Sequence, residues 1–231
     1  MAYIGQAPAN KPLGASDITD GIITDAKIAG MSSSKLSGAL PAISGASLTG
    51  ISSTWVQIGS TTTASSTATV DYDNLASTYQ LYVVIGTQIR PATNGAELEV
   101  NFGTDGSTYS ANKTSVYGYQ YNVEGDNEAE AGGLSNTPSL GNSSSDQPIS
   151  HNQSNHGTYG NAGFMIAYFS GIGQGSNYGS FDIYSNNWSQ TNRAWGARIN
   201  GHIQASADCI RFNFTSGNIA QGKFTLFGVN Q

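Results

Sequence analysis

The chain has 231 residues, a formal net charge of −6 and only 10% charged residues, far below the roughly 25% of an ordinary soluble domain. An acidic chain without a basic stripe argues against nucleic acid, whose phosphates it would repel, and against an anionic membrane surface. No stretch approaches the eighteen or so apolar residues of a membrane span, so we expect no membrane insertion.

The N-terminal segment carries isolated aliphatic side chains separated by Gly, Ser, Ala, Asp and Thr, with neither a helical period nor sustained alternation. Such a segment cannot bury itself, because fixing each residue costs about 1–2 kcal/mol of backbone entropy. We therefore predict that residues 1–52 form an extended arm that packs on other chains, with a disordered linker as the alternative. The predicted virion or trimer contacts of the arm are Ile18, Ile22, Ile28, Leu36, Leu40, Ile43, Leu48 and Ile51.

From Trp55 onward the sequence alternates Tyr, Val and Phe with polar residues, which predicts an all-β head domain over residues 53–231. Short strands and Gly-rich turns without a helical period favour an antiparallel β-sandwich of the jelly-roll type. A stretch near residues 124–160 lacks periodicity and holds much of the acid, so we predict one long structureless loop there. The predicted strands are residues 55–59, 68–72, 79–89, 96–102, 116–123, 163–170, 179–185, 195–203, 209–214 and 222–229.

Metal and nucleophile signals are weak. His151 and His156 lie five residues apart, whereas a helical zinc pair needs a spacing of four and no cysteine ligands lie nearby. The acidic segment 124–130 lacks the spacing of a calcium-binding loop. Cys209 is the single cysteine. Because it lies in an alternating strand, we interpret it as a buried small side chain rather than a reactive thiol. We predict no metal and no cofactor.

Paired carboxylates are the remaining catalytic candidate. Glu97 and Glu99 face the same way on a strand, and with Asp182 they are the acids that glycoside hydrolysis could use. The polar side of an amphipathic strand explains the first two equally well. No G-x-S-x-G turn presents a serine nucleophile. We therefore predict that the chain is not an enzyme.

Aromatic side chains give a stronger signal. Tyr117, Tyr119 and Tyr121 recur at every second position, so all three project from one side of a strand, either as a packed ladder or as a receptor or subunit contact. Tyr159 and Trp188 flank turns rich in Asn, Ser and Gln. An aromatic ring stacks on the apolar C–H side of a sugar while amides bond its hydroxyls, so we expect glycan contact around Trp188.

Three N-terminal motifs, MAYIGQAPANKPL, ASDITDGIITDAKIAG and LSGALPAISGASLTGI, resemble the N-terminal region of fibre and virion structural proteins of marine and freshwater tailed bacteriophages. The closing IRFNFTSGNIAQGKFTLFGV is similar to the last hairpin of the β-rich head in the same proteins. The resemblance implies a homotrimer that is assembled in the host cytoplasm, docks on other virion proteins of the tail or capsid, and is exposed on the particle surface. It brings no shared catalytic residues.

The function expected from these observations is a trimeric fibre or spike whose β-sandwich attaches to a host surface glycan. A capsid decoration or cement protein is the first alternative, and copy number per particle separates the two. A soluble glycan-binding lectin is a further alternative, which would be a monomer indifferent to loss of the arm. A polysaccharide-cleaving tailspike would need a deep groove with paired acids.

Overall fold

The computed structural model describes residues 54–123, 130–135, 138–157, 163–175 and 178–229. Among these residues there is no helix, and all paired strands run antiparallel, so the predicted all-β class is confirmed. The predicted arm and some predicted contacts lie outside the described residues. These contacts are Ile18, Ile22, Ile28, Leu36, Leu40, Ile43, Leu48, Ile51 and Tyr159.

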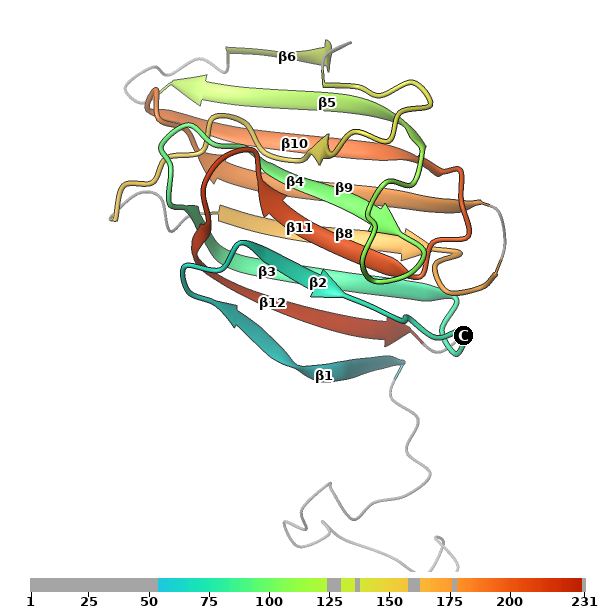
Figure 1. Ribbon diagram of the computed structural model, residues 1–231. Helices are drawn as coiled ribbons and strands as arrows, with labels where there is room; N and C mark the ends of the chain where they lie inside the picture. Colours follow the sequence, from blue (N-terminus) through green and yellow to red (C-terminus); the bar gives the residue numbers. More distant parts are fainter. Residues whose placement is uncertain (1–53, 124–129, 136–137, 158–162, 176–177, 230–231) are drawn as a thin grey trace, which may run out of the picture. The chain divides into compact units, whose positions relative to one another are not determined.

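The strands form two sheets, a larger one and a smaller one (Figure 1). In spatial order, the larger sheet contains β1 (Trp55–Ala64), β12 (Ile219–Val229), β3 (Leu81–Pro91), β8 (Gly163–Ser170), β9 (Gly179–Trp188), β10 (Arg193–Ile203), β5 (Lys113–Val123) and β6 (Glu130–Ser135). The smaller sheet contains β2 (Thr69–Tyr72), β11 (Cys209–Phe214), β4 (Leu98–Gly103) and β7 (Gln147–Pro148).

One hydrophobic core lies between the two sheets. Strand alternation places Phe212 of β11 and Phe102 of β4 on its inner side, and Phe169 and Phe181 of the larger sheet meet them. The Phe102 ring centroid lies 5.7 Å from that of Phe169 and 5.4 Å from that of Phe181. Each such buried side chain contributes roughly 1.5–3 kcal/mol. The two sheets therefore form a β-sandwich.

The stretch near residues 124–160 differs from its prediction, because its described part contains β6 and β7. Neither strand has an alternating pattern. β6 (EAGGLS) is held by backbone pairing with β5, and β7 has only two residues. Buried polar groups fix the chain near β7: Lys113 Nζ donates to the Ser145 carbonyl (2.6 Å) and Gln147 Nε2 to that of Pro138 (3.2 Å). In the described part of the stretch, only β6 and β7 depart from the predicted loop, because tertiary hydrogen bonds and strand pairing, not local pattern, order them.

Cys209 begins β11 and is completely buried, as its alternating surroundings predict. Its Sγ donates a hydrogen bond to Asp208 Oδ1 at 2.9 Å. Burial, reinforced by that carboxylate, raises the pKa of the thiol to about 11. Cys209 is therefore a neutral packing residue at physiological pH.

Candidate ligand site

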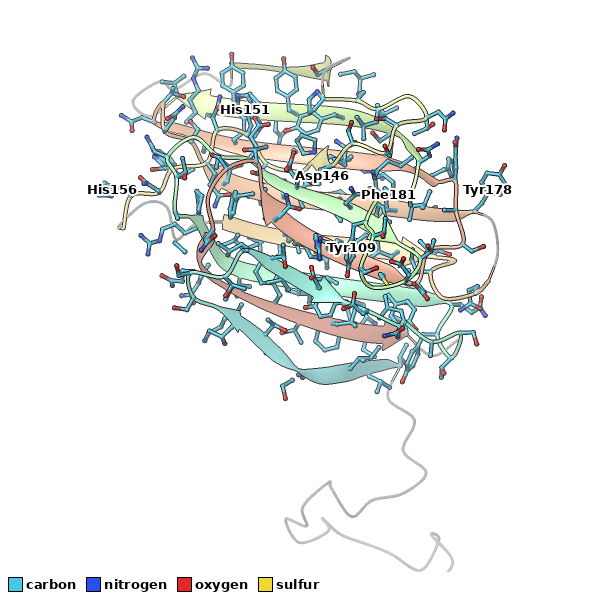
Figure 2. All side chains as sticks on the ribbon, in the orientation of Figure 1. Tyr109, Asp146, His151, His156, Tyr178 and Phe181 are labelled. Atoms are coloured by element: carbon cyan, nitrogen blue, oxygen red, sulfur yellow. The ribbon has the colours of Figure 1, made fainter. Side chains whose placement is uncertain are left out.

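Three loops line a small, half-open pocket of about 260 Å³, which we call the amide pocket. They are the β3–β4 connection, the segment after β7, and the turn between β9 and β10. Figure 2 shows His156, one lining residue, at one end of the sandwich and Tyr178 at the other. The lining residues are Asn94, Ser154, Asn155, His156, Trp188, Gln190 and Asn192.

The turn between β9 and β10 is shaped by its own polar side chains. Ser189 Oγ accepts hydrogen bonds from the backbone N–H groups of Thr191 and Arg193, each at 3.3 Å. Asn192 has a φ of 58°, a left-handed conformation that Asn tolerates better than most residues. The turn is tied to the neighbouring loop because Gln190 N donates to the Asn152 carbonyl at 2.8 Å. This turn therefore presents Trp188, Gln190 and Asn192 in a fixed arrangement.

Amide side chains link the three loops to one another. Asn94 Nδ2 donates to Gln190 Oε1 at 3.0 Å, and Asn94 Oδ1 accepts from Asn155 N at 3.2 Å. Asn155 Nδ2 in turn donates to the Ala92 carbonyl at 3.1 Å. A Cβ at Gly95 would lie 2.6 Å from Gln190 Nε2, so glycine is what allows Gln190 to lie across this loop. The pocket wall is thus built before any ligand arrives.

The lining of the amide pocket carries almost no charge. No carboxylate lines it among the described residues, and His156 is its one ionisable lining side chain. Behind the wall, Arg90 Nη1 donates to the Asn155 carbonyl at 3.2 Å, so this cation is directed at the backbone. Amides offer both donors and acceptors, and the Trp188 indole adds a flat apolar surface. This combination suits a neutral polyhydroxyl ligand.

The tyrosine row lies on the core-facing side of β5, where it packs around Trp195 of β10. Tyr119 and Tyr121 stack on the Trp195 indole at centroid distances of 5.1 Å and 4.8 Å, within 6° and 2° of parallel. His151 stacks on the same indole at 4.1 Å. Tyr117 is buried, and burial raises its pKa to about 12. Within one chain, therefore, these rings form a packed ladder.

Arg193 closes the end of this ladder. Its guanidinium lies 4.7 Å from the centroid of the Tyr121 ring, a cation–π distance. A sugar would need an open ring face, whereas the described contacts already engage the faces of Tyr119 and Tyr121. The sequence predicted that the three tyrosines share a side of the strand, but not that Trp195 and His151 join them. Those two residues come from distant segments, so no local pattern could reveal the contact.

A second polar cluster lies on the outward side of the smaller sheet, where Figure 2 labels Asp146. Asn213 Nδ2 donates to Glu99 Oε2 at 3.1 Å and to Asp146 Oδ2 at 3.2 Å. Burial, and then the charges of Asp146 and Glu97, raise the pKa of Glu99 to about 7. Glu97 Oε1 lies 3.0 Å from His151 Nδ1. This cluster therefore gathers three carboxyl groups, with the Asn213 amide between two of them and His151 at its edge.

The other acid considered for hydrolysis lies elsewhere. Asp182 belongs to β9 and projects from the outward side of the larger sheet, where Arg198 binds it at 2.9 Å. It therefore does not join Glu97 and Glu99. The two histidines do not form a common site either: His151 stacks on Trp195, whereas His156 lines the amide pocket.

Within the described ranges, no group of three or more His, Cys, Asp or Glu side chains could hold a metal ion. The same ranges contain no helix long and apolar enough to cross a membrane. Comparisons with family models, curated proteins and solved structures found no match to this chain.

Proposed function

We propose that this chain is a bacteriophage virion structural protein, a homotrimeric fibre or spike anchored to other virion proteins by residues 1–52. In this proposal the β-sandwich is exposed on the particle and attaches to a neutral host surface glycan through the amide pocket. The observation that carries the attachment role is the amide pocket itself: three loops, joined by amide hydrogen bonds, around a neutral cavity with an indole in its wall.

The size and charge of the pocket support a sugar as the ligand. Its volume of about 260 Å³ falls just below the roughly 300–1,000 Å³ of sites for drug-sized molecules, so it suits one or two sugar rings. The net charge of −6 disfavours anionic ligands. A buried hydroxyl must find hydrogen-bond partners, and Gln190 and Asn192 supply both donors and acceptors.

A trimer suits such a weak site. A ligand of this size binds through few atoms, so each pocket alone is expected to bind in the millimolar to high micromolar range. Three pockets on one spike, and several spikes on one particle, multiply the overall affinity by about 10²–10⁴ without any new contact. Because each single contact is weak, the particle could still dissociate and rebind along a cell surface before it attaches stably.

The test is binding of the full-length chain to neutral polysaccharide isolated from the host envelope, measured by surface plasmon resonance. Gln190→Ala and Asn94→Ala should each weaken binding at least tenfold, because each removes one partner of the 3.0 Å amide pair in the pocket wall. Gln80→Ala is the matched control, since Gln80 forms an exposed amide pair with Gln174 outside the pocket.

Equal binding by all three variants and the wild type would contradict the assignment of the pocket. A second outcome bears on the particle rather than the ligand. If purified particles carry hundreds of copies of the chain and no polysaccharide binds, a capsid decoration protein replaces the fibre. Release of reducing sugar from the polysaccharide would instead indicate a tailspike enzyme.

A further inference from the structure

The outward side of the larger sheet is unusually apolar. In an antiparallel sheet with one side on the core, the other side is normally polar. Here, of the six exposed large hydrophobic side chains among the described residues, five occupy outward positions of its strands, and the sixth, Tyr178, precedes β9 at one end of the sandwich (Figure 2). The five, which define the outer apolar face, are Trp55, Val116, Leu134, Phe164 and Tyr184.

Strand register shows that apolar residues also continue across the middle of this face. Ile85 of β3 lies opposite Ile166 of β8, and Ile166 lies opposite Tyr184 of β9. Val83, on the same side of β3, is completely buried although it is not part of the core between the sheets. Its neighbours on the outward side therefore cover it. The outer apolar face thus has a partly buried layer of its own.

The area of this face is sufficient for a stable interface. Eight strands at about 4.8 Å spacing span roughly 34 Å, and a strand of ten residues extends about 33 Å. The whole outward side of the larger sheet, apolar and polar side chains together, therefore covers roughly 1,100 Å², more than the ~800 Å² per partner of a standard protein interface.

The distribution of charge favours a second copy of this chain as the partner. On this side of the sheet, Asp182 and Arg198 neutralise each other through two hydrogen bonds of 3.1 Å and 2.9 Å, and Lys223 of β12, opposite Thr87 of β3, adds one positive charge. The outward side of the smaller sheet instead gathers Glu97, Glu99 and Asp146. Two copies that met through their smaller sheets would bring several like charges together, whereas contact through the outward side of the larger sheet, with a single unpaired charge among its described residues, reduces that repulsion.

The shape of the face fits a partner of the same kind. Leu134 of β6 is 80% exposed and Phe164 of β8 is 38% exposed, so both protrude. Between them lies a groove of about 350 Å³ where Gly118 and Gly196 carry no side chain. A protrusion on one copy that enters a groove on the next forms a head-to-tail contact, which closes into a three-membered ring where the rotation between copies is one third of a turn.

We infer that the outer apolar face is the interface through which the heads of neighbouring copies pack in the oligomer. This inference rests on the homotrimer of the proposed function, and it adds that the heads, not only the arms, hold the copies together. It does not depend on the ligand of the amide pocket.

The test is sedimentation of the full-length chain over a range of concentrations. The wild type should sediment at three times the 24.0 kDa chain mass. Leu134→Asp and Phe164→Thr should each raise the dissociation constant at least tenfold, and the double variant should be largely monomeric. Tyr178→Asp is the matched control, because Tyr178 is 68% exposed but lies outside the strands at one end of the sandwich, and it should leave the mass unchanged.

The outcomes separate this inference from the proposed function. Circular dichroism spectra that match the wild type at room temperature establish that the variants fold, as expected for side chains exposed in a single chain. If the double variant stays as trimeric as the wild type, the head interface is wrong while the arm-based trimer stands. If the wild type is a monomer at every concentration, the trimer and this interface are both wrong, and glycan binding is judged by its own assay.

Discussion

Glu99→Gln tests the electrostatics of the smaller sheet most directly. The pKa of Glu99 in the folded chain is about 7, against an ordinary value of 4.5. Between these pH values the folded state holds more protons than the unfolded state. The free energy of unfolding should therefore fall as pH rises from about 4.5 to about 7, and then level off. Glutamine cannot titrate, yet it keeps an oxygen that accepts the Asn213 hydrogen bond.

The size of the effect follows from the pKa difference. At about 1.36 kcal/mol per pH unit, a rise from 4.5 to about 7 corresponds to roughly 3 kcal/mol. Glu99 is only partly buried, so solvent screening reduces the expected effect to about 1–2 kcal/mol. Relative to the wild type, Glu99→Gln should therefore gain about 1–2 kcal/mol of stability between pH 4.5 and pH 8.

Urea unfolding followed by tryptophan fluorescence measures this difference, at fixed protein concentration because an oligomer's stability depends on it. Asp146→Asn should shift the pH range in which the free energy of unfolding falls, which we call the step, to lower pH. The reason is that Asp146 is the stronger of the two charges that raise the pKa of Glu99. Asp182→Asn removes an equal charge on the other sheet and should leave the step in place. Wild-type and Glu99→Gln curves that stay parallel from pH 4.5 to pH 8 would refute the reasoning.

Two further substitutions test packing. Trp195→Ala removes the indole on which Tyr119, Tyr121 and His151 stack, and should cost about 3–5 kcal/mol in urea unfolding; a loss below 1 kcal/mol would contradict a structural ladder. Gly173→Ala should cost about 2–4 kcal/mol, because φ is 70° and the added Cβ would lie 2.1 Å from the Leu75 carbonyl oxygen. Gly175→Ala is its control, with a φ of 64° but nothing within 4 Å of the Cβ, and should cost only about 1 kcal/mol; equal losses would rule out the clash.

The sequence predicted the central strands well because their alternation is a direct consequence of one-sided burial. The Ile210–Phe214 pattern in β11 and the Phe181–Ile183 pattern in β9 are examples, and both place their apolar residues in the core. β6 and β7 escaped prediction because pairing partners elsewhere in the chain define them. Strand pattern carries no information about such partners.

The candidate sites were predictable to a smaller extent. Trp188 was expected in a polar loop region and lies at the end of β9 in the wall of the amide pocket. Asn94 and Gln190, which meet at 3.0 Å, are separated by nearly a hundred positions, so only the fold brings them together. The same holds for Asp146 beside Glu99, because the ordered segment before β7 carries that carboxylate to the sheet. Local spacing predicts which side of a strand a residue occupies, but not what it meets.

The buried state of Cys209 makes the chain convenient to label. With the pKa of the thiol near 11, roughly one sulfur in ten thousand is ionised at pH 7, and the completely buried atom is shielded from reagents as well. A cysteine introduced at an exposed turn position such as Ser216 would then be the one site that a maleimide dye reaches quickly. Fluorophores or gold clusters can thus be attached while the native thiol stays in place, which would locate the chain on an intact particle.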